Sequence, residues 1–521
     1  MDKKKLSKQF EEFYTFGVKF LSKYLNSFNS TNYRSKEIEI LFGSWLIYFI
    51  RYYQLENEKI TIKKKKIRKI NLPFYKSFSD FNLLISKAVL QNTIYQIIKK
   101  NSKSKILPIQ SSKNIKYKNK QFKHFIYQLF RKDSDAVIYS IFQNRFRMFK
   151  IFFELFQMPI EPLNHFQNNT NSYNLKKREK ILEVCLNSFL SLKNNSDLLK
   201  FLKVMIYFIP TNYLECFKSN LKEIENSDWP KKPKFIMTAV SHIVSDEFKF
   251  WVFNKKNNQN TPFYVLQHGG DYELQAYNNK HIFEYRVADK FLSWGKAIRK
   301  RYREKQIIFG LNRFKYLEKI KFDKNGHYAM ALPHLFKIKH SVFAEDSSKN
   351  FSLVFEILKK FSLSLKKIIK PSLYGNLNDK RFFNKLLFKK INKFKKINFD
   401  FFYNHSNFQK SLNHSCLSIS IYNSTSFFLT LAANHPFVIL NYKNSFKFNQ
   451  KYKVTFDELT KSGIAFNDIN LLLKKLKFFE KNPMEIEKWW NSKRVKVSIK
   501  KLKKLFLIEK KTKFKELSNV K

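Results

Sequence analysis

The chain has 521 residues and a formal net charge of +59, with 44% hydrophobic and 17% aromatic residues. A chain of this length predicts two or three domains, and its hydrophobic content excludes global disorder. The three cysteines, Cys185, Cys216 and Cys416, are far apart. They exclude a disulfide framework and a CxxC metal pair, which favours a reducing, cytoplasmic compartment.

The positive charge has more than one interpretation. A basic surface attracts polyanions such as a nucleic acid, an anionic membrane surface or a phosphorylated substrate. However, Lys, Asn, Phe, Ile and Tyr dominate together, as A/T-rich codons would produce, and the lysines are scattered, with one local run at 63–66. We therefore favour compositional drift first, peripheral contact with the anionic inner face of the inner membrane second, and nucleic-acid binding last.

The first segments of the chain predict helices. The N-terminus leads into no apolar core of signal-peptide type, and the most apolar segment, Ile40–Ile50, is roughly half the ~20 residues of a membrane span. Apolar residues recur at spacings of three and four from Phe10 to Tyr24 and from Ile138 to Phe149. No glycine lies between 44 and 268. Residues 1–230 therefore predict a mostly helical N-terminal region.

From residue 231 onward the sequence alternates between strand-like and helical segments. Strand-like runs at 235–240, 263–266, 290–295 and 306–310 predict a first Rossmann-like lobe over 231–322. A second set at 327–333, 367–371, 417–422 and 436–440 predicts another over 323–480. Residues 481–521 are expected to form a basic helical tail. The predicted fold class is α/β, with two parallel sheets whose strands end at one crevice.

The most informative loop follows the strand at 263–266. Seven of only nine glycines lie at or beyond 269, and two of them, Gly269 and Gly270, stand directly after His268. Paired glycines let backbone N–H groups approach a phosphate or carboxylate, and a histidine there can serve as a general base. The alternative is a tight turn with a histidine that hydrogen-bonds locally. Glu284 and Asp289, further on, are either an acid pair near the crevice or a helix carboxylate and a turn residue.

Two loops of the second lobe are candidates for phosphate binding. The first is hydroxyl-rich and lies between a strand and a helix; it consists of Asn423, Ser424, Thr425 and Ser426. Its hydroxyls and N–H groups can hold a phosphate or simply cap the helix. The second is the end of the strand-like run at 367–371, where we expect Lys370 and Tyr374 to end the strand on the same face. Lys370 is either a phosphate partner or a solvated lysine.

The sequence lacks the motifs of several common enzyme chemistries. The sequence has no HExxH, His-x-His or cysteine-rich spacing, so we predict no metal site and no cofactor. It also has no Walker loop, GxGxxG or GxSxG, which excludes P-loop hydrolysis, simple dinucleotide redox chemistry and ordinary serine hydrolysis. The one DxD sequence, at 133–135, opens a segment predicted to be helical. A metal-independent transferase with two lobes remains open.

At these residues the chain resembles a family of bacterial transferases encoded among surface-polysaccharide and lipopolysaccharide biosynthesis genes, which looks like a GT-B glycosyltransferase pair of domains. The segments that carry the resemblance are 42–50, 210–215, 267–272 with 284, 289 and 292–295, and 424–436. It implies transfer of a glycosyl or related group from a nucleotide-activated donor to a glycan or lipid-linked glycan acceptor. The candidate catalytic residues are His268, Asp271 and Glu284.

On the same resemblance, the loop at 423–426 and Lys370 hold the donor diphosphate, and His268 lies near the acceptor. The chain departs from the family pattern at Asp271 and Glu273, where small residues are more usual. It also departs at Leu429, which replaces a glutamate that in GT-B enzymes commonly binds the donor ribose. Leu429 supports a second hypothesis, a catalytically degenerate protein that binds a glycan precursor. A basic nucleic-acid-binding protein is the third.

Overall fold

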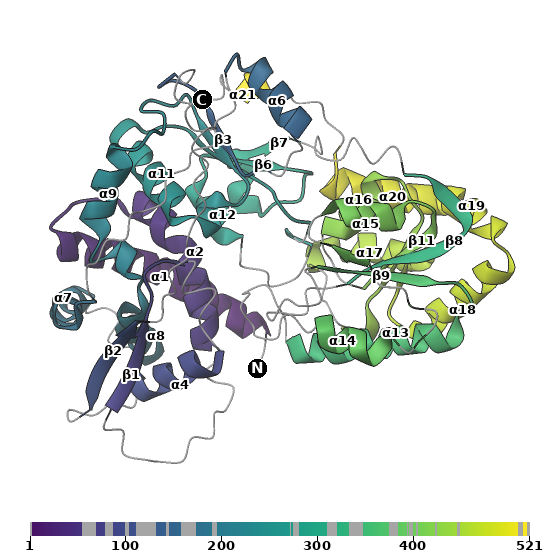
Figure 1. Ribbon diagram of the computed structural model, residues 1–521, viewed down its shortest axis with the longest axis horizontal. Helices are drawn as coiled ribbons and strands as arrows, with labels where there is room; N and C mark the ends of the chain where they lie inside the picture. Colours follow the sequence, from purple (N-terminus) through teal and green to yellow (C-terminus); the bar gives the residue numbers. More distant parts are fainter. Residues whose placement is uncertain are drawn as a thin grey trace.

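The structure is a computed structural model in which two groups of helices and strands lie side by side (Figure 1). It describes residues 3–54, 69–78, 87–98, 104–110, 132–141, 145–157, 173–189, 195–270, 272–274, 281–309, 320–332, 347–374, 384–392, 394, 397, 400–402, 405–421, 425–444, 449–508 and 514–517. Each group contains one large parallel sheet. The expected pair of Rossmann-type domains behind a helical N-terminal region is confirmed.

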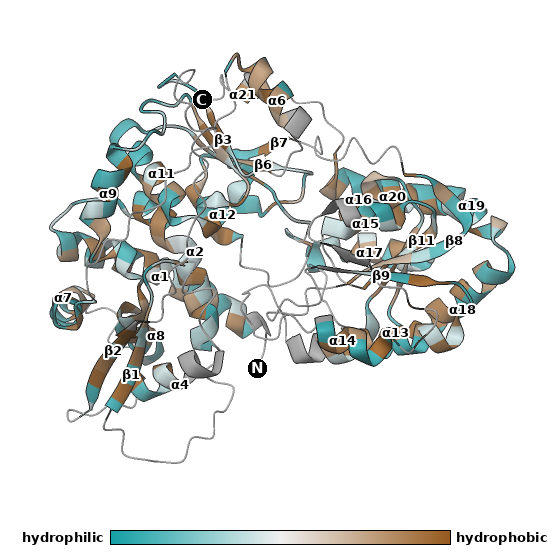
Figure 2. Cartoon of the chain, viewed as in Figure 1, coloured by the Kyte–Doolittle hydropathy of each residue, from teal (hydrophilic) through white to brown (hydrophobic). Residues whose placement is uncertain are grey.

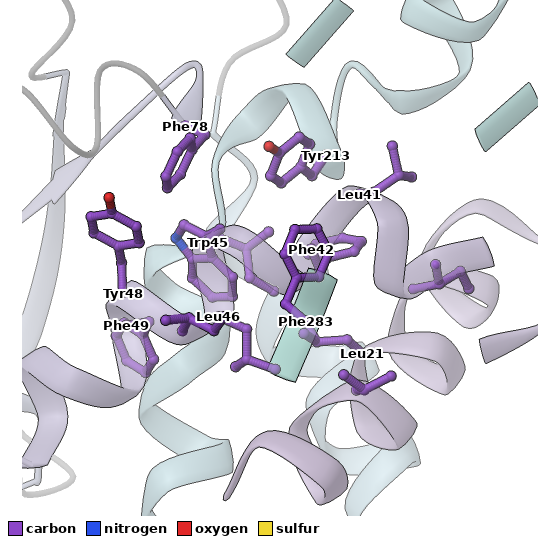
Figure 3. Close-up of a cluster of buried hydrophobic side chains, with 14 of the residues drawn as sticks. Leu21, Leu41, Phe42, Trp45, Leu46, Tyr48, Phe49, Phe78, Tyr213 and Phe283 are labelled. Carbon is purple, nitrogen blue, oxygen red and sulfur yellow. The ribbon is translucent and has the colours of Figure 1, made fainter. Parts of the chain in front are cut away.

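Helix α2 (Ser35–Gln54) is the centre of the N-terminal core. Nearly all of its side chains are buried, and it packs against α1 (Lys3–Asn29), α11 (Asp246–Gln259) and α12 (Ile282–Val287). Figure 3 shows the rings of Phe42, Trp45 and Phe49 among neighbouring side chains of this core. No helix in the described ranges is both long enough and apolar enough to cross a bilayer. Every residue from Ile40 to Ile50 is buried, so this apolar segment belongs to the core.

The N-terminal region is less purely helical than we predicted. Its further helices are α4 (Lys87–Ile98), α6 (Arg145–Glu154), α7 (Leu175–Asn187), α8 (Ser196–Met205) and α9 (Phe217–Glu225). It also contains a parallel strand pair, β1 (Lys69–Phe74) with β2 (Lys105–Gln110). The helix predicted from Ile138 is wrong at its start, because Val137–Tyr139 forms strand β3. A short apolar run buried on both faces has the same signature in either structure.

The first sheet begins at β3, well before residue 231. Its order is β3-β4-β5-β6-β7, and every neighbouring pair is parallel. Its other strands are β4 (Ile236–Thr238), β5 (Phe263–Leu266), β6 (Lys290–Ser293) and β7 (Gln306–Ile308). The sheet thus combines a strand from the N-terminal region with the four strands predicted for 231–322.

The second sheet has the order β10-β9-β8-β11-β12-β13, again with all neighbours parallel. Its strands are β8 (Phe322–Ala331), β9 (Ile369–Tyr374), β10 (Asp400–Phe402), β11 (Ser415–Ser420), β12 (Phe437–Leu440) and β13 (Ala465–Phe466). Numbered along the chain, this is the 3-2-1-4-5-6 order of a doubly wound Rossmann sheet. The direction of winding reverses between β8 and β11.

Helices cover the second sheet on both faces. They are α13 (Ser347–Ser364), α14 (Asn384–Ile391), α15 (His405–Leu412), α16 (Thr425–Ala432), α17 (Lys453–Lys461), α18 (Ile469–Lys481), α19 (Met484–Asn491) and α20 (Lys493–Phe506). The apolar residues divide into one cluster that contains Phe428 and Phe506 and another that contains Ile357 and Leu472. Burial of both faces explains why β11 is buried at all six positions.

The C-terminal segment is not a detached tail. After α20, which packs on α17, the chain returns to the first domain. The N–H of Ala297 donates to the carbonyl of Leu505 (2.9 Å), and the N–H of Ile508 donates to the carbonyl of Trp294 (2.8 Å). Helix α21 (Phe514–Leu517) then packs against α6 (Figure 1). The end of the chain therefore ties the two domains together.

Gly43 offers a test of this core. A Cβ at Gly43 would overlap the ring of Phe283 on α12 and approach the hydroxyl of Tyr14 on α1. We expect Gly43→Ala to lower the free energy of unfolding by about 1–3 kcal/mol, since overpacking a filled core forces side chains off their rotamers. Urea unfolding followed by circular dichroism measures the change.

Gly17→Ala is the matched control on α1. There the nearest atom to a new Cβ is the flexible end of Leu46, at 3.0 Å. The gain in helix propensity, about 1 kcal/mol, should offset the small displacement of Leu46. Equal losses in both variants would contradict the packing of α2 against α12.

Candidate active site

Two histidines follow neighbouring strands of the first sheet. His268 comes two residues after β5, and His242 lies on the short helix α10 (Ser241–Val244) that follows β4. The strands are parallel, so both histidines lie at the carboxyl edge of the sheet. His242 is completely buried, whereas 22% of the His268 side chain is exposed.

Glu284 on α12 lies at the centre of this histidine pair. One of its carboxylate oxygens, Oε1, is 3.4 Å from His242 Nε2 and 3.4 Å from His268 Nδ1. The other, Oε2, is 3.2 Å from Nδ1 of His281 and accepts a short, 2.5 Å hydrogen bond from the hydroxyl of Tyr272. The Glu284 side chain is only 1% exposed. We call these five residues the Glu284 cluster.

The charge of the Glu284 carboxylate is balanced by its neighbours. Burial alone would raise the pKa of Glu284, but the charge on His268 and hydrogen bonds from His242 and His281 outweigh it and hold the pKa well below its usual value. Burial and the adjacent carboxylate together raise the pKa of Tyr272 well above its usual value. At neutral pH the cluster therefore holds an ionised carboxylate and a protonated phenol.

These ionisation states determine the tautomer of His268. An ionised carboxylate only accepts hydrogen bonds, so Tyr272 donates its single hydroxyl proton to Glu284. The 2.8 Å contact between the Tyr272 oxygen and His268 Nδ1 then requires Nδ1 to be the donor. A neutral His268 consequently carries its lone pair on Nε2. The chain His268–Tyr272–Glu284 fixes the ring in the form that accepts a proton at that nitrogen.

The loops around His268 are held by Gln267. Its amide nitrogen donates to the carbonyl of Gly269 (2.9 Å), and its side-chain oxygen accepts from the N–H of Trp294 (2.9 Å). Gly270 is buried and Gly269 is half-buried. One side chain therefore connects the loop after β5 to the loop after β6. Asp271 lies outside the described residues.

Glu273 explains one departure from the family pattern. Its φ is 54°, in the left-handed region that costs a non-glycine residue roughly 1–2 kcal/mol. The Glu273 carboxylate accepts from Nε of Arg299 (3.3 Å) and from the hydroxyl of Tyr285 (3.4 Å). A small residue is the natural choice at such a φ, and these two contacts hold a larger one there.

Asp289 is not the partner of Glu284. Its carboxylate accepts from the N–H of Phe263, the first residue of β5, and from Lys256 (2.7 Å), and pairs with Lys36 (3.2 Å). It therefore lies at the amino end of β5, whereas His268 lies at the carboxyl end. Of the two interpretations left open, the structure favours a turn residue with a structural ion pair.

The second candidate loop lies where the winding of the second sheet reverses. Helix α16 begins at Thr425, five residues after β11 ends, and ligands of doubly wound sheets bind at such a reversal point. Ser426 is buried, and its carbonyl accepts from the hydroxyl of Thr430 (3.0 Å). The helix brings its partial positive end to this edge. Asn423 and Ser424 lie outside the described residues.

Lys370 occupies a different level of the sheet. It is the second residue of β9 and pairs with Ala329, while Tyr374 is the last residue of that strand. Tyr374 lies four positions further along the strand than Lys370, a distance of about 13 Å. Our expectation that both end the strand is therefore wrong for Lys370. Strand β9 begins at Ile369, two residues after the start of the predicted run at 367–371, and it extends to Tyr374.

Leu429 belongs to the interior of the second domain. It is completely buried on α16, in the same cluster as Phe427, Phe437 and Leu502. A carboxylate in these surroundings would lose its hydration without a charged partner. The leucine at this position stabilises the packing of α16 and cannot bind hydroxyl groups.

The two domains contact each other through residues that lie near the candidate loops in sequence. Leu274, six residues after His268, and Trp294 after β6 belong to the same apolar cluster as Phe428 of α16 and Phe506 of α20. The Trp294 and Phe428 rings are 6.1 Å apart, and the N–H of Asn449 donates to the carbonyl of Leu274 (3.0 Å). The first domain therefore contacts α16 through Trp294, which follows β6, and contacts the segment at 449 through Leu274.

Three members of the Glu284 cluster were not predicted from the sequence: His242, Tyr272 and His281. His242 could have been found, because it follows β4 in the same way that His268 follows β5. His281 carries no such signal, since its place depends on stacking against the Tyr272 ring, with the ring centroids 3.4 Å apart. Among the described residues, no set of three or more His, Cys, Asp and Glu side chains has the geometry to hold a metal ion.

The chain thus has two domains with parallel Rossmann-type sheets, and the first domain carries a buried carboxylate against a partly exposed histidine. Residues 1–520 match the sequence profile described as "LIC12162 family transferase". The chain belongs to this family. No curated protein matches it.

Two solved structures resemble the chain at low identity. A UDP-GlcNAc 2-epimerase from Neisseria meningitidis, solved with UDP-GlcNAc bound, is 11% identical with a TM-score of 0.34, covering 83% of this chain and 98% of the epimerase. The spinosyn rhamnosyltransferase SpnG, solved with spinosyn aglycone, is 8% identical with a TM-score of 0.28, covering 63% and 78%. The fold described above rests on the two parallel sheets of the chain itself and not on these two structures.

Glu284→Gln tests the charge balance of the cluster. Removing one partner from a buried set of charges is expected to lower the free energy of unfolding by about 3–5 kcal/mol at pH 7. The folded-state pKa is depressed, so the stabilisation is present above the usual value of 4.5 and is lost as the pH falls toward the folded pKa. Urea unfolding of both proteins from pH 7 to pH 4 should show that the gap between their free energies of unfolding narrows. A gap that widens toward pH 4 would contradict an ionised Glu284.

Proposed function

We propose that the protein transfers a glycosyl or related group from a nucleotide-activated donor to a surface-polysaccharide or lipopolysaccharide precursor. The observation that carries the proposal is the His268–Tyr272–Glu284 chain at the carboxyl edge of the first sheet, in a domain that contacts α16 through Trp294 and Phe428. Membership in a transferase family supports it independently. The proposal places the reaction on the cytoplasmic side of the inner membrane.

In this mechanism His268 acts as the general base. Its Nε2 takes the proton from an acceptor hydroxyl while that oxygen bonds to the carbon of the transferred group. The bond from this carbon to the donor phosphate oxygen breaks, and the nucleotide diphosphate leaves with the electron pair. Glu284, through Tyr272, stabilises the imidazolium that forms, as a carboxylate does in other histidine-based sites.

The leaving diphosphate is proposed to bind at the start of α16. Thr425 and Ser426 there, with the N–H groups of the first helical turn, can hold phosphate oxygens. Asn423 and Ser424 precede them in the sequence and complete the hydroxyl-rich loop. The positive end of the helix would stabilise the negative charge that develops on the departing group.

The remaining candidates have subordinate roles in this scheme. Gly269 and Gly270 would face the diphosphate from the first domain. Lys370 and Tyr374 are weaker candidates, since Lys370 lies below the edge of the sheet. Asp271 stays a candidate for binding the acceptor. The scheme requires neither a metal nor a cofactor.

A second candidate function is that of a binding protein that has lost activity. Leu429 favours it, because a buried leucine cannot bind the donor ribose. Such a protein would retain a glycan precursor without turning over a nucleotide sugar.

A thermal-shift screen separates these candidates. UDP-, GDP-, CMP- and dTDP-sugars are added at increasing concentration to the full chain. A donor at about 100 times its Kd should stabilise the folded enzyme by about 2.7 kcal/mol, since ligand binding to the native state adds its free energy to folding. A protein that binds only the acceptor would show no shift with any donor, and that result would reject the transferase.

His268→Asn tests the proposed base once a donor is known. Asparagine keeps a polar side chain but cannot accept a proton, so we expect kcat to fall by about 10²–10⁴-fold with little change in donor binding. The control is His414→Asn in the second domain, where the side chain is exposed and asparagine tolerates the φ of 61°. Full turnover by His268→Asn would remove His268 from the mechanism.

A further inference from the structure

Helix α6 presents aromatic residues to solvent. Phe149, Phe153 and Phe156 are 62%, 70% and 79% exposed, although the helix also has a buried face with Ile151 and Phe152 in the first-domain core. The spacing of four residues puts Phe149 and Phe153 along one side of the helix, and Phe156 follows two residues after the helix ends. We call them the Phe149 stripe. The helix lies at the outer edge of the first domain and is largely hydrophobic in colour (Figure 2).

The exposed phenylalanines are concentrated in the Phe149 stripe. Among the described residues, Phe478 is the only other strongly exposed phenylalanine, at 50%. Three of four such residues therefore fall within eight positions of one another. Clustered exposed apolar side chains mark a docking surface, whereas single ones need no explanation.

The end of the helix keeps the third ring outside. Phe156 has a φ of 52°, in the position after the last helical turn where glycine is the usual residue. The N–H of Gln157 donates to the carbonyl of Phe152 (3.1 Å), which closes the helix around Phe156. A phenylalanine therefore stands at a position whose backbone conformation favours glycine.

The composition of α6 and of the C-terminal segment favours one kind of partner. In sequence, α6 carries Arg145, Arg147 and Lys150 against a single acid, Glu154. Helix α21, which packs on α6, lies in a segment with five lysines and one glutamate between 510 and 521. A second copy of this chain would bring another +59 charge against these basic residues. An anionic phospholipid surface, in contrast, offers both an apolar layer and negative head groups.

We propose that the Phe149 stripe docks the protein on an anionic phospholipid bilayer. The three rings enter the boundary between head groups and acyl chains, and the positive charge of this part of the chain, which includes the exposed Lys150, attracts lipid phosphates. A helix of ten residues lies in the membrane surface and does not cross it. This docking is independent of the proposed transfer reaction, and it is tested without any measurement of activity.

Vesicle flotation of the full chain tests the proposal. Vesicles of phosphatidylcholine with about 30% phosphatidylglycerol, an anionic lipid, are compared with phosphatidylcholine alone, at low and at physiological salt. We expect the triple variant Phe149→Ser, Phe153→Ser, Phe156→Ser to bind the anionic vesicles at least tenfold more weakly than the unmodified protein. The matched control is Leu363→Ser, Val454→Ser, Leu471→Ser, whose residues are 69%, 73% and 60% exposed on other helices. It should bind like the unmodified protein.

Insertion is distinguished from adsorption by charge with a second variant. Phe153→Trp introduces a fluorophore into the stripe, and Val454→Trp does so on α17. Phospholipids brominated on their acyl chains should quench the tryptophan at 153 and not the one at 454. Equal quenching at both positions, or equal binding by both triple variants, would overturn the proposal. A dimer in sedimentation velocity that only the Phe149 stripe variant abolishes would replace it with self-association.

Discussion

The arrangement of the loops at the carboxyl edge of the first sheet depends on one buried carboxylate. A carboxylate that is 1% exposed loses several kcal/mol of hydration and persists only with close, complementary partners. Glu284 obtains them from α10, from the loop after β5 and from the residues just before its own helix. These segments therefore have one arrangement relative to each other, set by hydrogen bonds to a single group. The partly exposed ring of His268 is held by this arrangement and not by its own packing.

The sequence predicted much of this fold for a physical reason. Strands β5, β6 and β7 are short apolar runs bounded by polar residues and glycine, and β5 agrees with the predicted run at both ends. Strand β3 could not be separated from a helix, because Val137 and Ile138 are both buried and show no period of two. The site was predicted in part: His268 and Glu284 were chosen, but the stacking of Tyr272 on His281 depends on tertiary structure. No spacing along the chain encodes it.

The second domain shows how topology corrects an inference from composition. Lys370 was chosen because a lysine at the end of a strand can pair with phosphate, yet β9 continues four residues beyond it. Thr425 was chosen for its hydroxyl, and the order of strands places it beside the reversal between β8 and β11. Leu429, three residues after Ser426 on the same helix, is a core residue. Recognition of a donor at α16 would therefore rely on phosphate contacts more than on ribose contacts.

Positive charges in the interior and positive charges at the surface are accommodated in different ways. Buried cations are matched individually: Arg178 is fully buried and pairs with Glu215 at 2.7 Å, and Lys249 is fully buried and pairs with Asp246 at 3.2 Å. With 100 basic and 41 acidic residues, most of the remaining charge stays at the surface, where it repels other copies of the chain. The chain leaves β3 toward α6 at the same edge of the first sheet where it leaves β5 toward His268, because the strands are parallel. Helix α6 then runs back along the sheet, because the side chain of Gln157 donates to the carbonyl of Ala136 (2.6 Å) and accepts from its N–H (2.9 Å), just before β3. A bilayer that contacts Phe156 would thus lie toward the amino edge of the sheet, away from the edge that carries His268.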